Sequence, residues 1–404
     1  MWVLSTAETA RRLGVKPQTV YAYVSRGMLT RHRDSDGRRS RFDPAEVERL
    51  AGRARHGGRA GALEVVVDTE LTLIDAGGAL HYRGRDATEL ARFRSFEQVA
   101  ELLWDSGDAN TPWRSPGEMT RVCEDAQAAL PEGARPVERM RVVVAAAAAT
   151  DPLRDDRRPA AVRAVGRTLI AALVDALPLR SDPRDGSIAA RLWSRLADAP
   201  PSPAALNTLD AALVLLADHE LAASTLAARV AASAWADPYL VVLTGLGALG
   251  GALHGASAGA VEALLAGIES PEDAGAALGE RLRADGRLPG FGLGVYRDRD
   301  PRADALLDLL PRAADPERVA VSTAVIALAG RQDGPAPNVD FALGALSVGC
   351  GLVPGAAEAI FSLARVAGLV AHAIEEYPHR LRFRPRAAYT GPAPLTTPSS
   401  PRRP

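Results

Sequence analysis

The chain has 404 residues, 47% hydrophobic and 24% charged, so it is long enough for two or three domains and its composition excludes global disorder. Its net charge is −1, but residues 1–60 carry thirteen basic and six acidic side chains, a local excess that favours a nucleic-acid partner for this part. Two cysteines exclude a disulfide framework and a cysteine-type zinc site, and the single lysine, Lys16, excludes a phosphate-loop or Schiff-base lysine in the main body.

The start of the chain lacks the basic and then apolar pattern of a secretory signal peptide. A chain with only two cysteines also suits a reducing compartment, so we expect a cytoplasmic protein. The longest uncharged stretch, residues 238–261, contains several glycines and a histidine. We interpret it as packed core rather than as a membrane span.

Residues 1–55 have the pattern of a separate small domain. A first helix capped by Ser5 and Thr6 is predicted up to Leu13, a turn follows, and a second helix is predicted over residues 18–28. Residues 30–42 form a basic hairpin-like segment, and a third helix is predicted over residues 43–50. The phrases TAETARRLGVKPQTVYAYVSRGML and GRRSRFDPAEVERL resemble the winged helix-turn-helix of the MerR and excisionase families.

This resemblance implies that one set of side chains approaches the major groove of DNA and that the arginines of the hairpin lie along phosphates. The alternative is a docking module with a solvated basic face. The groove candidates are Lys16, Gln18, Thr19, Tyr21 and Tyr23, and the phosphate candidates are Arg31, Arg33, Arg38, Arg39 and Arg41.

After a linker over residues 56–62, two short strands are predicted at 64–73 and 79–82, joined at Gly77 and Gly78. From Asp86 onwards the apolar spacing is helical, and no regular alternation of strands and helices follows, so the body is mainly α. The proline-rich end, residues 392–404, is expected to be disordered. Helical segments are predicted around residues 95–104, 136–149, 160–177, 187–197, 203–217 and 220–235.

Two short motifs point to other chemistries. Residues 245–250 match the glycine pattern of dinucleotide-binding proteins, but the chain continues helically at 260–268 where a strand is required. Residues 255–259 match the nucleophile elbow of serine hydrolases, with Asp340 and His372 in the matching chain order. The strands that such a hydrolase needs are not predicted. Both motifs are therefore disfavoured.

A collinear set of segments resembles citrate synthase. It comprises DHELAASTLAARVAAS and GALGGALHGASAGAV (residues 218–233 and 247–261), GFGLGVYRDRDPRADAL (290–306), and PNVDFALGAL with ARVAGLVAHAIEE and RPRAAYTG (337–346, 364–376 and 384–391). The segment DAGGALHYRGRDATEL, residues 75–90, resembles the opening hairpin of that family. The resemblance spans residues 68–391 and implies a helical large domain, residues 63–256 and 346–391, and a small domain, residues 257–345.

The family joins an acyl-CoA to a 2-oxo acid, and this chemistry needs a base at the thioester α-carbon and a donor to the enolate oxygen. By resemblance Asp340 is the base and His254 the donor. The alternatives are a helix cap for Asp340, a core histidine for His254 and surface charges for the arginines. The resemblance implies that the oxo acid is bound by His219, Arg302, Arg365 and Arg384, the last from the partner subunit of a homodimer.

The resemblance breaks at one catalytic position. Where the family reads G-F-G-H-R-V-Y, this chain has Leu293 and Gly294 in place of the histidine and arginine. The family's histidine hydrogen-bonds and protonates the ketone of the oxo acid, and leucine can do neither. The segment after His254 also departs, because Gly-Gly-Ala-Asn-Glu of the family is residues 255–259, Gly-Ala-Ser-Ala-Gly, here.

Two functions follow. The first is a citrate or methylcitrate synthase that condenses acetyl- or propionyl-CoA with oxaloacetate, with activity reduced by Leu293; the reaction needs no metal and no cofactor, since acyl-CoA is a substrate. The second is a DNA-binding regulator whose catalytically weak body senses a CoA thioester or a 2-oxo acid. Asp340, His254 and the arginines favour the first, and Leu293 with the basic N-terminal part favours the second.

Overall fold

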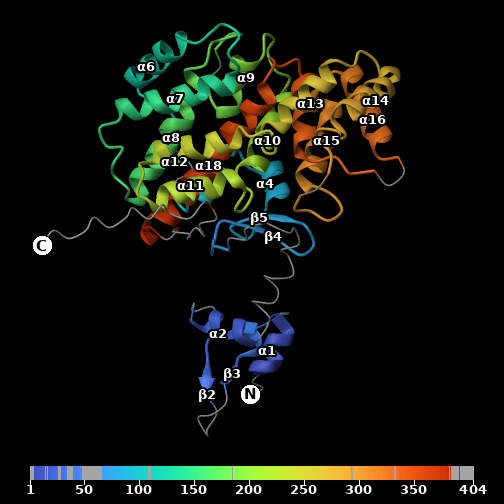
Figure 1. Cartoon of the computed structure of the whole chain (residues 1–404). Coiled ribbons are helices and arrows are strands. Elements are labelled where there is room, and N and C mark those ends of the chain that lie inside the picture. The colour runs from blue at the N-terminus through green and yellow to red at the C-terminus, as the bar shows by residue number, and fades with distance from the viewer. Residues whose placement is uncertain are drawn as a thin grey trace, which may run out of the picture. The chain divides into compact units, whose positions relative to one another are not determined.

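The computed structural model describes residues 4–13, 15, 17–25, 29–33, 40–47, 66–107, 111–183, 185–292, 294–331, 334–381, 383 and 391. The chain divides into two compact units, Met1–Asp68 and Thr69–Pro404. The segment 56–62 that was predicted as a linker lies outside the described residues, as does the proline-rich tail, 392–404. Figure 1 shows a small unit built from short helices and strands, and a larger, mainly helical unit.

The first unit is a helix-turn-helix with a strand hairpin, as predicted. Its elements are β1 (Leu4–Ser5), α1 (Thr6–Leu13), α2 (Pro17–Ser25), β2 (His32–Arg33) and β3 (Ser40–Phe42). At the start of α1 the Ser5 hydroxyl accepts the Glu8 N–H at 3.3 Å and the Glu8 carboxylate accepts the Ser5 N–H at 2.9 Å, a reciprocal cap. The predicted hairpin is also present, because β2 pairs antiparallel with β3.

Two details of this unit, the position of β1 and the burial of Tyr23, differ from the sequence-based expectation. Strand β1 pairs with the other edge of β3, giving the order β1-β3-β2. Tyr23, expected to face outward, is half-buried and packs against the core formed by Ala10, Leu13, Val20, Leu29, Phe42 and Val47. The described part of α2 ends at Ser25, and residues 26–28 lie outside it. Of the third predicted helix, the described residues 44–47 are helical.

The second unit begins with a three-stranded antiparallel meander: β4 (Thr72–Ile74), β5 (Leu80–Tyr82) and β6 (Arg85–Asp86). The predicted strand over 64–73 is wrong for its described part before Thr72. Strand β5 is only three residues long and pairs with Thr72–Ile74, so the described residues 66–71 precede the paired part of this sheet. The strand β6 was not predicted.

The rest of the second unit is helical, which confirms the mainly α class. Its helices are α4 (Ala87–Phe93), α5 (Phe96–Leu103), α6 (Gly117–Ala128), α7 (Pro136–Thr150), α8 (Pro159–Asp175), α9 (Ile188–Leu196), α10 (Pro203–Leu216), α11 (Ala223–Ser233), α12 (Pro238–Leu249), α13 (Ser257–Ala266), α14 (Ala274–Asp285), α15 (Pro301–Ala313), α16 (Pro316–Ala329), α17 (Val339–Gly349) and α18 (Ala356–Glu376), with short 3₁₀ turns at Pro271–Asp273 and Tyr377–His379.

Many of these helices begin at a proline that follows a capping side chain. Ser202, Asp237, Asp300 and Asp315 each accept backbone N–H groups in the first turn of α10, α12, α15 and α16. Proline fits the first helical position because it has no N–H to leave unpaired there. These local signals fix the start of α15, on which the candidate Arg302 lies.

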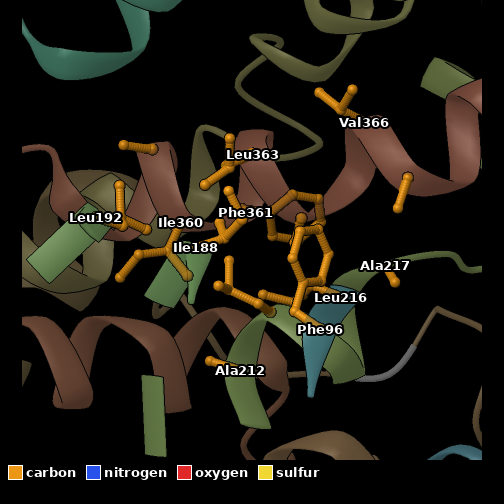
Figure 2. Packing of buried hydrophobic residues seen from close by; sticks show 14 of the residues in the cluster. Phe96, Ile188, Leu192, Ala212, Leu216, Ala217, Ile360, Phe361, Leu363 and Val366 are labelled. Atoms are coloured by element: carbon orange, nitrogen blue, oxygen red, sulfur yellow. The ribbon is translucent and has the colours of Figure 1, made fainter. Parts of the chain in front are cut away.

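Helix α18 forms the centre of the second unit. Its side chains are apolar on nearly all sides because other helices surround it. Figure 2 shows Ile360, Phe361 and Leu363 of α18 meeting side chains of α9, α10 and α5. Residues 356–379 form the one described helical stretch long and apolar enough to cross a membrane, and 94% of its most apolar window is buried in the protein.

Helix α12 packs closely on α18 at Gly245, where a Cβ atom would lie 2.6 Å from the Leu369 side chain. Gly245 and Gly247 lie inside helix α12 and not in a strand-to-helix turn. This position excludes the dinucleotide-binding motif. In Figure 1 the helices α13 to α16 gather on one side of this unit and α6 to α8 on the other. The division into residues 257–345 and the remainder stays a prediction, and α17 crosses its boundary at 345–346.

Candidate active site

The described candidates come from five elements that converge in the second unit. His219 follows α10, His254 follows α12, Arg302 and Asp340 lie in the first turns of α15 and α17, and Arg365 lies in the middle of α18. The charges of Arg302 and Arg365 act on both His219 and Asp340. Residues that are up to 146 positions apart in sequence are thereby placed in one electrostatic environment.

His219 is held as a neutral ring. Its Nε2 atom lies 2.8 Å from the Tyr296 hydroxyl, and the two rings are tilted with their centres 5.5 Å apart. Burial lowers the pKa of His219 well below its usual range, and the charges of Arg302 and Arg365 lower it further. The ring is therefore a hydrogen-bonding group rather than a cation at neutral pH.

His254 is also neutral, and its hydrogen bonds indicate which nitrogen carries the proton. The Ser224 N–H donates to Nε2 at 3.4 Å, and the Ser224 hydroxyl lies 2.8 Å from the same atom. An accepting Nε2 leaves the proton on Nδ1. Burial, with the charge of Arg365, lowers the pKa of His254 to about 4. His254 therefore offers a neutral N–H donor, and Ser224 is a partner that sequence reasoning missed.

Asp340 is not the cap of its helix. The Asn338 side chain caps α17 by accepting the Asp340 N–H at 3.0 Å and the Phe341 N–H at 3.4 Å. The Asp340 carboxylate is left for another role. Burial raises its pKa to about 6, against the opposing effects of the Arg302 charge and of a hydrogen bond from Ser257. A carboxyl in such a site has the pKa of a general base that works near neutral pH.

Arg302 is buried and fixed by Asp300. Its Nε and Nη2 atoms donate to the two Asp300 oxygens at 3.0 and 2.8 Å, and its guanidinium lies over the Tyr296 ring, 5.4 Å from the ring centre. Burial alone would lower the pKa of Arg302, but the Asp300 carboxylate raises it. Asp300 also accepts the Val339 N–H at 3.0 Å, so it holds the starts of α15 and α17 together.

Arg365 differs from Arg302 because its terminal nitrogens are not paired. Its Nε donates to the Leu216 carbonyl at 3.0 Å and its guanidinium lies over Phe361. Only 1% of the residue is exposed, yet neither Nη1 nor Nη2 has a hydrogen-bond partner within the described ranges. Burial lowers the pKa of Arg365, and the nearby Asp218 carboxylate opposes this effect. A buried guanidinium with two free donors is suited to binding a carboxylate in the bidentate mode.

Two candidates of the second unit, Leu293 and Arg384, lie outside the described residues. The backbone before Leu293 is anchored near Asp340: Gly292 N–H donates to the Ala336 carbonyl at 3.0 Å, and the Asn338 amide donates to the Gly292 carbonyl at 3.1 Å. Position 293 therefore follows a segment that is fixed beside the cap of α17.

The candidates of the first unit are described in part. Thr19 and Tyr21 lie on α2, with the Arg31 guanidinium 5.8 Å from the centre of the Tyr21 ring, and Arg41 lies in β3. The side chains of Gln18 and Arg33 are not described, although their backbones belong to α2 and β2. Lys16, Arg38 and Arg39 lie outside the described residues.

The structure excludes the serine-hydrolase alternative. The two ring nitrogens of His372 are occupied, Nδ1 by Arg229 at 2.9 Å and Nε2 by Asp218 at 3.2 Å. Ser257 begins α13 and bonds to Asp340 instead. The groups that a nucleophile elbow would need are therefore committed to other contacts.

Comparison with known proteins agrees with this geometry. Residues 62–386 match the family model described as citrate synthase, C-terminal domain. The chain belongs to the citrate synthase family. Residues 3–55 match a helix-turn-helix domain model, so the two parts of the fold resemblance are both confirmed.

Relatives within the citrate synthase family include enzymes of two names. The citrate synthase of Haloferax volcanii is 31% identical over 355 residues, covering 81% of this chain and 94% of the relative. The 2-methylcitrate synthase of Mycobacterium tuberculosis is 29% identical over 356 residues, covering 82% and 90%. These relatives place the chain with transferases of the citrate synthase type.

Solved structures show the same fold. One is the ternary complex of citrate synthase from Thermoplasma acidophilum with carboxymethyl coenzyme A and oxaloacetate, with a TM-score of 0.69 and 26% identity over 82% of this chain and 96% of that one. Citrate synthase from Thermotoga maritima gives a TM-score of 0.68 at 25% identity, covering 85% and 97%.

Proposed function

We propose that this protein condenses an acyl-CoA, acetyl- or propionyl-CoA, with oxaloacetate to give citrate or methylcitrate and CoA. The observation that carries the proposal is the buried Arg365. Its two terminal nitrogens have no hydrogen-bond partner among the described residues, and it shares one electrostatic environment with His219, His254 and Asp340. A dicarboxylate supplies the missing acceptors. The complex of the Thermoplasma relative with oxaloacetate and a CoA analogue supports this choice of ligands.

In the proposed reaction the Asp340 carboxylate takes a proton from the α-carbon of the thioester. The neutral N–H of His254 donates to the enolate oxygen that develops, and Arg302, Arg365 and the partner subunit's Arg384 hold the carboxylates of oxaloacetate while His219 contacts it. The α-carbon then forms a bond to the ketone carbon as the C=O π bond opens, and the resulting alkoxide oxygen takes up a proton from water, since Leu293 offers none. Hydrolysis of the thioester by water releases CoA.

The two cysteines take no part in this chemistry. Burial raises the thiol pKa of Cys123 and of Cys350 to about 11, and both are free thiols. Free thiols are consistent with the cytoplasmic location that we propose. The proposed reaction uses acyl-CoA as a substrate and requires neither a metal nor a separate cofactor.

A homodimer is part of this proposal, because Arg384 is assigned to the partner's site. Apolar side chains remain exposed on or beside α11 and α12, the two helices that precede His254. The exposed fractions of Val230, Leu240 and Leu253 are 44%, 49% and 85%. Burying these side chains against a second copy removes them from water.

The exchange of acetyl-CoA α-protons with deuterated water is expected to rise with pH through about 6 and then level off. Burial raises the pKa of Asp340 to about 6, and only the ionised carboxylate accepts a proton, so activity is lost as the pH falls below that value. His254 stays neutral over this range because its pKa is lowered to about 4. NMR of the acetyl methyl group from about pH 5 to 8 tests this; a flat profile would assign the base elsewhere.

Replacing Leu293 by histidine is expected to raise the rate of condensation with oxaloacetate by up to about 10²-fold, since one hydrogen-bond donor to a developing oxyanion typically has this effect. The imidazole would supply the proton donor that the family places there. Steady-state CoA release by wild type and Leu293→His, measured side by side with several oxo acids, checks the gain. A wild type already turning over at about 10 per second or faster would show that another group polarises the ketone.

The first unit favours a second function, a regulator that binds DNA and senses a CoA thioester or an oxo acid. Residues 3–55 match a helix-turn-helix domain, and residues 1–60 carry more than twice as many basic as acidic side chains. Among the proposed DNA-binding side chains, Tyr21 and Arg31 are exposed. The two functions are compatible, because separate units would carry them.

Duplex DNA affinity of the full-length protein is expected to fall by about 10³-fold or more between about 50 and 200 mM salt, for six or more phosphate contacts. The reason is that each neutralised phosphate releases a counterion. Mobility-shift titrations with random-sequence duplex across this salt series measure it. Absence of binding even at the lowest salt would rule out the DNA-binding function.

A further inference from the structure

The segment Thr69–Ile74 follows the helix-turn-helix unit along the chain and is hydrogen-bonded to the surroundings of His219. The Thr72 hydroxyl donates to the Asp218 carboxylate at 2.5 Å, and the Ile74 N–H donates to the Glu220 carboxylate at 2.9 Å. The two acceptors are the residues immediately before and after His219. At its other end, the Thr69 hydroxyl and the Glu70 N–H donate to Glu375 of α18 at 2.8 and 2.7 Å.

Asp218 is fully buried, and its position bears directly on Arg365. One carboxylate oxygen accepts from Thr72 and lies 3.2 Å from His372 Nε2, while the other has no hydrogen-bond partner within the described ranges. Gly368 lets α18 approach so closely that a Cβ atom there would lie 2.4 Å from this second oxygen. Arg365 lies one turn earlier on the same helix.

The charge of Asp218 balances that of Arg365 without using its donors. Burial acts to raise the pKa of Asp218, but the contact with His372, the charge of Arg365 and the Thr72 hydrogen bond outweigh burial and lower this pKa below its usual value, so the group is ionised. No salt bridge joins Asp218 to Arg365 directly among the residues described, and the Nη atoms of Arg365 stay unpaired. A nearby, non-contacting carboxylate stabilises a buried guanidinium and leaves its donors for a ligand.

The backbone on the other side of His219 is strained. Glu220 has a φ of +50°, in the left-handed region that side chains rarely occupy. Such a conformation persists where the surroundings over-determine it, and the bond from the Ile74 N–H to the Glu220 carboxylate is one such constraint. Both neighbours of His219 are therefore held by the same six-residue segment.

We propose that Thr69–Ile74 is a structural part of the oxo-acid site, with Thr72 acting as a positioning residue: it fixes Asp218, whose charge stabilises Arg365 and whose backbone leads directly into His219. This inference rests on the proposed function, since it takes oxaloacetate as the ligand. Because coupling between two sites is reciprocal, binding of the oxo acid in turn orders the segment that leads out of the helix-turn-helix unit.

The test uses the full-length protein with Thr72→Val, which removes the hydroxyl and keeps the shape, and Thr72→Ser, which keeps the hydroxyl. The matched control is Thr208→Val, because Thr208 is also buried and its hydroxyl donates only within α10, to the Ala204 carbonyl at 2.8 Å. Calorimetry measures oxaloacetate affinity, steady-state kinetics separates the KM for oxaloacetate from that for acetyl-CoA, and amide hydrogen exchange follows residues 69–74.

Thr72→Val is expected to bind oxaloacetate about tenfold more weakly, the effect of one charge-assisted hydrogen bond, with the KM for acetyl-CoA unchanged. Thr72→Ser and Thr208→Val stay within about twofold of wild type. In the wild type, oxaloacetate slows amide exchange at residues 69–74, a readout that needs no variant to fold. Unaltered affinity in Thr72→Val, or unaltered exchange while oxaloacetate binds, overturns the inference. A wild type that binds no oxaloacetate overturns the proposed function itself, and the inference with it.

Discussion

Asp340→Asn is expected to lower the exchange of acetyl-CoA α-protons by about 10²–10⁴-fold, the usual contribution of a general base. Asparagine keeps the shape of the side chain and cannot take the proton. The helix should form normally, because Asn338 and not Asp340 caps α17. The measurement is NMR of the acetyl methyl signal in deuterated water, with oxaloacetate or an unreactive analogue present.

Cys350→Ala and Cys123→Ala serve as controls for the loss. Both thiols have raised pKa values through burial, and neither is assigned a step in the reaction, so both variants should exchange at the wild-type rate. The pH dependence seen in the wild type should also disappear from any residual exchange in Asp340→Asn. Undiminished exchange in that variant would show that another group is the base.

The second large effect is expected for Arg365→Met, with oxaloacetate affinity falling about 10²–10³-fold. Truncating one partner of a buried charged pair costs about 2–5 kcal/mol, and the bound carboxylate would lose both terminal nitrogens. Methionine keeps an apolar chain of similar length against Phe361. Calorimetric titration with oxaloacetate measures the loss of affinity. Circular dichroism checks that the fold survives when the negative charge of Asp218 is no longer balanced by the Arg365 guanidinium.

The control is Arg121→Met on α6. Arg121 is largely exposed and makes a salt bridge of 3.1 Å with Asp125, also exposed, one turn away. Exposed pairs of this kind contribute about 0–1 kcal/mol, so the affinity for oxaloacetate should not change. An Arg365→Met protein that folds and binds oxaloacetate like the wild type would exclude Arg365 from the carboxylate site.

The helices that sequence patterns predicted well are those with local start signals. Predicted segments at 136–149 and 203–217 correspond to α7 (Pro136–Thr150) and α10 (Pro203–Leu216), both of which begin at a proline. Sequence patterns did not predict the elements whose formation depends on residues far away in the chain. Strand β4 is restricted by the length of β5, and β1 exists because it reaches the free edge of β3. Helix α6 was not among the predicted segments.

Only part of the candidate site was predictable from the sequence. The motif identified His219, His254, Arg302, Asp340 and Arg365 because these residues carry the family's sequence pattern, and the structure brings them into one region. It did not identify the hydroxyl partners. Ser224 reaches His254 across thirty residues, and Thr72 reaches Asp218 across 146 residues. Serine and threonine are common, and only the packing of helices against the meander decides which of them contact the site.

Condensation of an acyl-CoA with oxaloacetate is tested most directly by oxaloacetate-dependent release of CoA by the wild-type protein, with the product identified by mass spectrometry. We expect CoA release only when both substrates are present, in a one-to-one ratio with citrate or methylcitrate, at a rate below the roughly 10 per second of a typical enzyme because position 293 is leucine. Absence of any citrate or methylcitrate with both substrates saturating, in a protein that remains folded, would contradict the claim.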